Sequence, residues 1–236
     1  MLRAVGFAAP RADCSLALPT PASPSVAVMP VDGPQYPANL VLRGRSVLVV
    51  GGGPVATSKV QGLLDGGADV LTVVAPDVTD ELAAMPVAIE RRPYRSPEAA
   101  AHRLVVTATS DPDVNHQVFL DADAAGVWVN SADDPANCTF TLPARVRRGS
   151  LLVTVATGGH SPAVASWLRR RFEAEFGPEY DELLELLSAE RERIKASGRS
   201  TEGLPWQDAL DSGLVDLLRN QRTAEAREVL RKCLSS

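Results

Sequence analysis

Short apolar runs alternate with amphipathic stretches between residues 46 and 130. Ser46 to Val50 is an almost continuous apolar run that ends at glycine, which is typical of a strand buried on both faces. In Pro54 to Asp65 the apolar residues recur at helical spacing, and Gly66-Gly67 ends the predicted helix. Val70 to Val74 predicts a second strand. Together these segments predict a βαβ unit with parallel strands and a right-handed crossover.

The alternation continues through three more predicted strands and one helix. The strands are Val87 to Arg91, Leu104 to Ala108 and Val127 to Asn130. The helix opens at Asp111-Pro112, where Asp111 is the expected N-cap and the proline takes the first helical position, at which its missing N–H costs nothing. The pattern therefore predicts an α/β fold with a Rossmann-like, doubly wound parallel sheet.

The second half of the core has a different pattern. Phe140 to Arg147 and Leu151 to Ala156 flank Arg148-Gly149-Ser150 and predict a hairpin or a short strand pair. Ser161-Pro162 is expected to cap a helix that runs to about Phe176. A small α/β region therefore follows the parallel sheet.

The last part of the chain has a helical pattern. From Pro178 onward apolar residues recur on one face, and Glu190 and Arg193 are spaced for an i,i+3 ion pair. A break follows, and then two shorter helices are predicted near Trp206 to Asn220 and Thr223 to Leu234. These segments predict a small C-terminal helical domain.

Composition and charge exclude several classes of protein. The 236 residues carry a formal net charge of -5, which argues against general binding to nucleic acid or to an anionic membrane. No apolar stretch approaches the roughly 20 residues that span a bilayer. Cys14, Cys138 and Cys233 lack the paired spacing of a zinc site or a disulfide framework. We therefore expect a cytoplasmic protein with no membrane span and no bound metal.

The glycine-rich turn Gly51-x-Gly53-x-x-Ala56 matches the dinucleotide-binding fingerprint in its Ala-ending form. The first glycine allows a tight turn, the second lets the backbone approach a pyrophosphate, and the small third residue lets helix and strand pack closely. Pro54 and Val55 lie at the helix N-terminus, which supplies the positive end of the helix dipole. Because the turn lies in a βαβ unit, we interpret it as a nucleotide site, and a turn without a ligand is the alternative.

The choice between NAD and NADP depends on Pro76-Asp77, which follows the second strand. Asp77 lies 24 residues beyond Gly53 (77 − 53 = 24), close to the spacing of about 20 at which an acidic residue accepts from the ribose 2′-hydroxyl. No Arg or Lys stands nearby in the sequence to receive a 2′-phosphate. NAD is therefore favoured, and the alternative is that Asp77 caps the next helical turn.

Arginines are concentrated between Leu142 and Phe172, where the sequence has no Asp or Glu. Planar guanidinium groups suit carboxylates, so this stretch predicts a polyanionic small ligand. For residues 169–171 the alternative is that the arginines bind no ligand and lie in solvent at the C-terminal end of a helix, where cations are favoured. The residues concerned are Arg145, Arg147, Arg148, Arg169, Arg170 and Arg171, with His160 among them.

Two loops add candidate ligand groups. Thr157 to Pro162 leads into a helix whose N-terminus suits an anion, although its glycines and Ser161 are also explained by structure alone. Asn130 to Pro135 follows the last parallel strand at its carboxyl end, where open α/β sheets bind ligands. Asp133 and Asp134 in that loop are candidate catalytic groups, and the alternative is that they only form a turn or cap a helix.

Four motifs occur in the order and spacing of one known family. They are GGGPVATSK (Gly51 to Lys59), TATSDPDVN (Thr107 to Asn115), NSADDPANCTFTLPA (Asn130 to Ala144) and TGGHSPAVA (Thr157 to Ala165). With these motifs the chain resembles the precorrin-2 dehydrogenase module of siroheme synthases. The resemblance covers roughly residues 36–187 and extends into the helical tail. No glycine-rich methyltransferase module follows Leu234, so we expect the free-standing form.

The resemblance implies NAD-dependent oxidation of precorrin-2 to sirohydrochlorin by a homodimer. It implies that Asp133 is the catalytic carboxylate and that Thr109 joins the glycine turn and Pro76-Asp77 in binding NAD. Ser131-Ala132 replaces a usual apolar pair, which we expect to widen the pocket slightly. The substrate has eight carboxylates, and its implied contacts are Asn137, Arg145, Thr157, Gly158, His160 and Ser161.

Pattern and resemblance together divide the chain into four segments. The first is a disordered N-terminal extension over residues 1–35, where prolines are frequent. An NAD-binding Rossmann domain over residues 36–137 and a dimerisation and substrate region over residues 138–177 follow. The last is the helical domain over residues 178–236.

Two alternative functions compete with the dehydrogenase. One is a bifunctional enzyme that also inserts ferrous iron into sirohydrochlorin, with Asp133 and His160 as candidate groups. The other is a non-catalytic module that senses NAD. The motifs Asn130 to Ala144 and Thr157 to Ala165 argue against it, because a sensor has no need of them.

Overall fold

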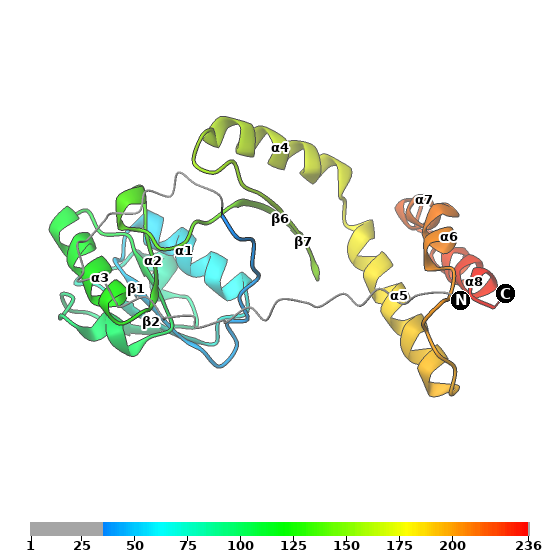
Figure 1. The fold of residues 1–236 in the computed structure, drawn as a ribbon, viewed down its shortest axis with the longest axis horizontal. Coiled ribbons are helices and arrows are strands. Elements are labelled where there is room, and N and C mark those ends of the chain that lie inside the picture. Colours follow the sequence, from blue (N-terminus) through cyan, green and yellow to red (C-terminus); the bar gives the residue numbers. More distant parts are fainter. Residues whose placement is uncertain (1–34, 236) are drawn as a thin grey trace, which may run out of the picture.

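The computed structural model describes residues 35–235 of the chain. The predicted N-terminal extension therefore lies outside the described residues, apart from Gln35. Figure 1 shows an elongated arrangement of three parts. The parallel sheet and its helices lie at one end, a hairpin and a long helix lie in the middle, and a cluster of helices lies at the other end.

A five-stranded parallel sheet forms the first part. The order β3-β2-β1-β4-β5 places β1 in the centre, so the chain winds first to one side and then to the other. The predicted Rossmann-like, doubly wound sheet is confirmed. Its strands are β1 (Ser46–Val50), β2 (Val70–Val74), β3 (Ala88–Glu90), β4 (Leu104–Thr107) and β5 (Trp128–Ser131).

Helices cover both faces of the sheet. Helices α1 (Pro54–Asp65) and α2 (Asp80–Ala83) share one apolar core with Val47 and Val49 of β1. Helix α3 (Pro112–Ala124) and the 3-10 helix η1 (Glu98–Ala101) pack on the other face, against Leu48 and Val50. Alternate residues of β1 thus enter opposite cores, which explains why the whole strand is apolar.

The sheet brings three loops to one edge. Val50 at the end of β1 pairs with Thr107 at the end of β4, and Thr107 pairs with Ser131 at the end of β5. The glycine turn, the loop with Thr109 and the loop with Asp133 therefore leave neighbouring strands at the carboxyl edge. Open α/β sheets bind their ligands at this edge.

The middle part is a hairpin that carries one helix. Strands β6 (Ala144–Arg148) and β7 (Leu151–Val155) pair antiparallel, and α4 (Pro162–Glu175) packs against both. The predicted hairpin is confirmed, but β6 begins at Ala144 rather than Phe140 because Phe140 packs against the core beneath α1. Ser161 caps α4 as predicted, since its hydroxyl accepts from the N–H of Val164 at 3.2 Å.

Four helices form the last part around a core of their own. The expected Glu190–Arg193 ion pair is present, at 2.5 Å. The prediction of a single helix over Trp206 to Asn220 was wrong. Gly213 takes a left-handed φ of 86° and divides this segment into α6 and α7. The helices are α5 (Glu179–Ala196), α6 (Trp206–Asp211), α7 (Leu214–Arg219) and α8 (Thr223–Cys233).

Candidate functional site

Two glycines of the turn after β1 have no room for a side chain. Gly51 has a φ of 123°, and a Cβ built there would lie 2.4 Å from the carbonyl oxygen of Ala108. A Cβ on Gly52 would lie 1.9 Å from the carbonyl oxygen of Asp77. The turn is therefore held tightly between the loops that follow β4 and β2.

Gly53, the next residue, faces open space. Apart from Gly53 itself and its two chain neighbours, no atom of the described residues lies within 4 Å of the position that a Cβ on Gly53 would take. Gly53 is the N-cap of α1 and offers no side chain to the N–H groups of the first turn, in which no acidic residue occurs. These N–H groups are available for an anion, so the turn fits the pyrophosphate of a dinucleotide. Pro54 and Val55 are exposed beside it, whereas Ala56 is buried and packs α1 onto the sheet.

Asn115 of α3 fixes the loop after β4. Its side-chain oxygen accepts from the hydroxyl of Thr107 at 2.5 Å and from the hydroxyl of Thr109 at 2.8 Å. Its amide donates to the carbonyl oxygen of Thr109 at 3.0 Å. Thr109 is thereby held beside the glycine turn. The sequence did not single out Asn115, although it ends the second motif four residues after the N-cap Asp111.

Pro76 and Asp77 are exposed beside the glycine turn. The N–H of Thr79 donates to the carbonyl oxygen of Gly52 at 3.0 Å, which joins this loop to the turn. Thr79 is also the N-cap of α2, and its hydroxyl accepts from the N–H of Leu82 at 3.2 Å. The alternative in which Asp77 caps this helix is therefore wrong, and its carboxylate stays exposed to solvent.

The loop after β5 presents an exposed carboxylate. Asp133 has a left-handed φ of 60°, which is uncommon for a residue other than glycine. The N–H of Ala132 donates to the carbonyl oxygen of Thr107 at 2.8 Å, so this loop is joined to the end of β4. Asp133 thus lies on the same edge of the sheet as Thr109 and the glycine turn.

A buried thiol closes the Asp133 loop. Cys138 Sγ accepts from the N–H of Ser131 at 3.2 Å and lies 3.3 Å from the carbonyl oxygens of Ser131 and Asp134. Burial raises the pKa of the Cys138 thiol, which keeps it protonated and able to donate to these carbonyls. Ser131 is only 2% exposed, and the expectation that Ser131-Ala132 widens the pocket stays a prediction.

Asn137 is buried behind the same loop. Its amide donates to Oδ2 of Asp134 at 2.6 Å, and its oxygen lies 2.8 Å from Nδ1 of His116 on α3. Because both ends of the amide are engaged within the chain, the structure places Asn137 among the residues that support the loop.

Arg145 lies on the outer surface of α1. Gly62, inside this helix, makes room for it, because a Cβ there would lie 2.7 Å from Nη2 of Arg145. The guanidinium borders a hollow of about 380 Å³ that Thr57 and Thr79 also line. The structure thus places this predicted substrate contact against the helix that follows the glycine turn.

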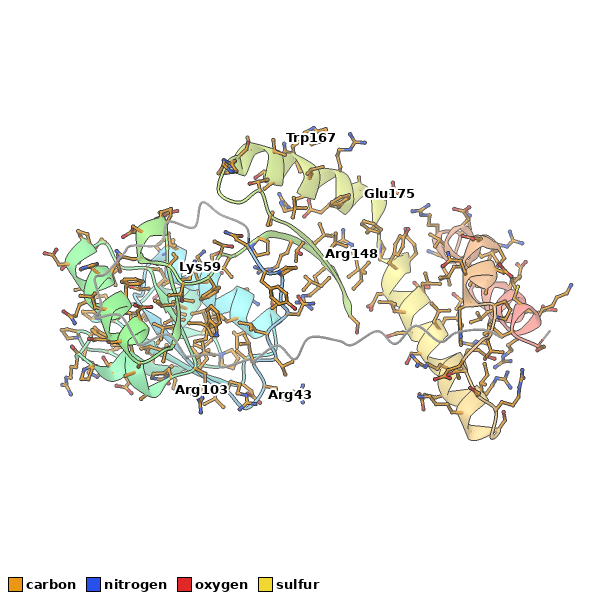
Figure 2. The ribbon with its side chains drawn as sticks, viewed as in Figure 1. Arg43, Lys59, Arg103, Arg148, Trp167 and Glu175 are labelled. Atoms are coloured by element: carbon orange, nitrogen blue, oxygen red, sulfur yellow. The ribbon has the colours of Figure 1, made fainter. Side chains whose placement is uncertain are left out.

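Three of the six arginines have partners within the middle part of the molecule. Arg148, labelled in Figure 2, donates to two carbonyl oxygens at the end of α4, at 2.8 and 3.2 Å. Arg169 pairs with Glu173, and the guanidinium of Arg171 lies 4.9 Å from the centre of the Trp167 ring. The hypothesis of a polyanionic ligand therefore depends mainly on Arg145, Arg147 and Arg170.

The loop before α4 is a tight turn. Gly158 and Gly159 have left-handed φ values of 59° and 81°, and the hydroxyl of Thr157 accepts from the N–H of Ser161 at 3.3 Å. His160 is exposed at the end of this turn. Because α4 packs on β6 and β7, the hairpin rather than the parallel sheet positions these residues.

Within residues 35–235 no group of three or more His, Cys, Asp or Glu side chains is placed to hold a metal ion. None of the helices in the same range is long and apolar enough to cross a membrane.

A protein-family model described as "Putative NAD(P)-binding" matches residues 38–144. The match spans all five strands of the parallel sheet and the three loops at its carboxyl edge. The expectation of a dinucleotide-binding domain is confirmed.

Curated relatives match most of the chain. A siroheme synthase of Pseudomonas entomophila is 42% identical over 196 residues, which are 80% of this chain and 42% of the relative. A siroheme synthase of Thioalkalivibrio sulfidiphilus is 37% identical over 207 residues, which are 85% of this chain and 42% of the relative. The chain therefore spans less than half the length of these relatives.

A solved structure named "SirC, precorrin-2 dehydrogenase" has the same fold. It superposes with a TM-score of 0.65 at 27% identity, and the match covers 86% of this chain and 100% of that one. The resemblance to the precorrin-2 dehydrogenase module of siroheme synthases, indicated by the four motifs, is confirmed.

Proposed function

We propose that this protein oxidises precorrin-2 to sirohydrochlorin and passes the hydride to NAD. The observation that carries the proposal is the exposed carboxylate of Asp133, held at the same sheet edge as the dinucleotide-binding turn. The likeness to siroheme synthases and to SirC supports this tetrapyrrole as the substrate.

The glycine turn and its neighbours fit NAD. Gly53 and the first turn of α1 would hold the pyrophosphate, and Thr109 would contact the cofactor from the loop after β4. Pro76-Asp77 would receive the adenosine ribose, and an exposed carboxylate there favours a 2′-hydroxyl over a 2′-phosphate. When bound, the nicotinamide ring supplies the hydride acceptor.

The reaction removes one hydride and one proton from the macrocycle. The hydride leaves with its electron pair, and the proton passes to a base near the same carbon. We assign this role to Asp133, since its carboxylate is exposed on a loop whose backbone is fixed. Substrate carboxylates would be held by guanidinium groups, including Arg145, and by the loop that contains Thr157, Gly158, His160 and Ser161.

We further propose that two copies of the chain assemble through the middle part. Helix α4 has no buried residue, although Val164 and Trp167 are large and apolar, and Figure 2 shows Trp167 on the outer side of the helix. A two-stranded hairpin alone is marginally stable, so a second copy of this unit is the natural cover for it. The free thiols of Cys138 and Cys233 fit a reducing compartment, and we propose that the protein works in the cytoplasm.

The activity is tested with purified protein, precorrin-2 and NAD. We expect the absorption spectrum of sirohydrochlorin to appear together with NADH. Asp133→Asn keeps the size of the side chain and the tolerance of a left-handed backbone but removes the charge. The variant should bind NAD as the wild type does and lose at least about 100-fold in kcat, in the range of general base catalysis. Full activity of the Asp133→Asn variant would show that Asp133 is not the catalytic base.

A further inference from the structure

Asp133 owes its position to the residues around it. Its φ of 60° is one of two positive values among the non-glycine residues that the structure describes. Its side chain is exposed, and the hydrogen bonds found within residues 35–235 do not include one that its carboxylate accepts. The direction in which this side chain leaves the main chain is therefore set by the backbone on either side of it.

Both flanking residues are anchored. On one side, Ala132 donates through its N–H to the carbonyl oxygen of Thr107 at 2.8 Å. On the other side, the carbonyl oxygen of Asp134 accepts from the N–H of Asn137 at 3.2 Å and lies 3.3 Å from Cys138 Sγ. The carboxylate of Asp134 accepts from the amide of Asn137 at 2.6 Å. The N–H of Asp134 donates to the carbonyl oxygen of Ser131 at 3.4 Å. Asp134 thus makes four hydrogen bonds, two of them with Asn137.

Asn137 connects Asp134 to helix α3. Its side-chain oxygen can only accept, so Nδ1 of His116 is the donor across their 2.8 Å contact. Helix α3 is the element whose first turn carries Asn115, the residue that fixes Thr109 beside the glycine turn. The same helix therefore supports the loop of the candidate base and the loop of the candidate cofactor site.

We infer that Asn137 is a positioning residue that ties the Asp133 loop to α3 and so aims the Asp133 carboxylate at the reacting carbon. This role rests on the proposed dehydrogenase function. It differs from the direct substrate contact that the sequence suggested for Asn137. Its amide has both ends engaged and is only 9% exposed, so it acts through Asp134 and the backbone of Asp133.

The test replaces the amide by a group of the same size. In Asn137→Asp a carboxylate oxygen faces the carboxylate of Asp134, so the donor is lost and repulsion takes its place. We expect kcat to fall about tenfold or more, because a misplaced base slows the proton transfer. The Kd for NAD should stay within about twofold of the wild-type value, because the change does not affect how the cofactor binds. Asn220→Asp is the matched control, since the side-chain amide of Asn220 also donates to an aspartate, at the backbone carbonyl oxygen of Asp216, but lies in the helical domain.

A double variant separates positioning from general loss of stability. If Asn137 acts through the Asp133 carboxylate, Asn137→Asp should lower kcat no further in an Asp133→Asn background. Additive losses would overturn the inference. So would an Asn137→Asp variant that raises only the KM for precorrin-2, because that result indicates direct substrate contact.

Hydrogen exchange of the loop gives a readout that does not depend on activity. We expect the amides of Ala132 and Asp134 to exchange at least about tenfold faster in Asn137→Asp than in the wild type or in Asn220→Asp. Unchanged exchange would overturn the inference even if activity were lost. If the wild type does not oxidise precorrin-2 at all, the proposed function fails, and faster exchange would still show that Asn137 holds the loop.

Discussion

Gly52 and Gly53 are adjacent in the sequence but have opposite surroundings. A Cβ on Gly52 would meet the carbonyl oxygen of Asp77 at 1.9 Å, whereas a Cβ on Gly53 would meet no described atom within 4 Å. The backbone of Gly53, with φ of -78°, also suits any residue. A side chain at these two positions should therefore affect different properties.

We predict that Gly52→Ala destabilises the fold and that Gly53→Ala blocks the ligand. Overpacking against a backbone carbonyl should lower the free energy of unfolding by about 1–3 kcal/mol in Gly52→Ala. Gly53→Ala should stay within about 0.5 kcal/mol of the wild type but bind NAD at least about tenfold more weakly. Urea denaturation and calorimetric titration with NAD measure the two effects. Normal NAD affinity in Gly53→Ala would contradict a pyrophosphate at this turn.

The roles of single residues could be predicted from the sequence where those roles depend only on neighbours in the chain. The fingerprint identified Gly51, Gly53 and Ala56 because a turn, an open backbone and a small packing residue are needed within six positions. It could not identify Gly52, whose neighbour Asp77 comes from the loop that follows another strand. The sequence suggested Asn137 as a substrate contact, and its hydrogen bond with His116 could not be predicted because it depends on how α3 packs.

Among the elements, α5 depends on one buried carboxylate. Glu190 is 3% exposed and bonds with Arg193 of the same helix and with Arg231 of α8. The hydrogen bond from Arg193, opposed by burial and aided by Arg231, holds the pKa of the Glu190 carboxyl below its usual value. The ionised form is thus stabilised in the folded protein.

We predict that Glu190→Gln destabilises the helical domain in a pH-dependent way. At pH 7 the loss should be about 1–2 kcal/mol, a modest value because both arginines are half exposed and screened by solvent. A carboxyl with a lowered folded pKa stabilises above its unfolded pKa, and this contribution is lost as the pH falls through the folded pKa. The difference between variant and wild type should therefore shrink below about pH 4.

Chemical denaturation followed by circular dichroism at pH 7 and at pH 3.5 checks the Glu190 prediction. Glu192→Gln on the same helix is the control, since Glu192 pairs with Lys195 at the surface. This control should have no measurable effect at either pH. A Glu190→Gln loss that is equal at both pH values would contradict the argument.

Element boundaries were predictable where one local signal sets them. Helix α1 and strand β2 have the predicted bounds, because glycines and a proline mark their ends. The start of β6 was not predictable, since Phe140 is apolar for a reason outside the hairpin. Gly213 lies within a helical pattern, and only its left-handed φ distinguishes α6 from α7.

For the whole molecule, the exposed face of α4 has the largest consequence. Trp167 on this helix is 49% exposed and is stacked with Arg171. We predict that the wild type is a dimer and that Trp167→Arg weakens the dimer about 30-fold or more, because a buried interface tryptophan contributes about 2 kcal/mol. Trp128→Arg is the control, since Trp128 is 53% exposed but lies on β5.

Sedimentation velocity over a range of protein concentrations measures the dimer prediction. A wild type that stays monomeric, or a Trp167→Arg variant that stays dimeric, would contradict it. Trp128→Arg should remain dimeric throughout.

The arrangement of the three parts was the least predictable from the sequence. Alternating strands and helices indicate a parallel sheet, but no local pattern shows where a hairpin such as β6-β7 lies relative to it. Arg145 illustrates the limit. Its charge suggested a ligand contact, and its position on α1 follows only from the packing of β6 beside Gly62.

The central position of β1 also affects how the chain is made. Its partner β4 begins 54 residues after β1 ends (104 − 50 = 54), whereas β2 follows after one helix. At a synthesis rate of about 5–20 residues per second, a nascent chain waits roughly 3–11 s between these two strands. During that time one edge of an apolar strand has no partner, which is the condition that favours aggregation. The strand that organises the finished sheet is therefore the one most in need of protection on the ribosome.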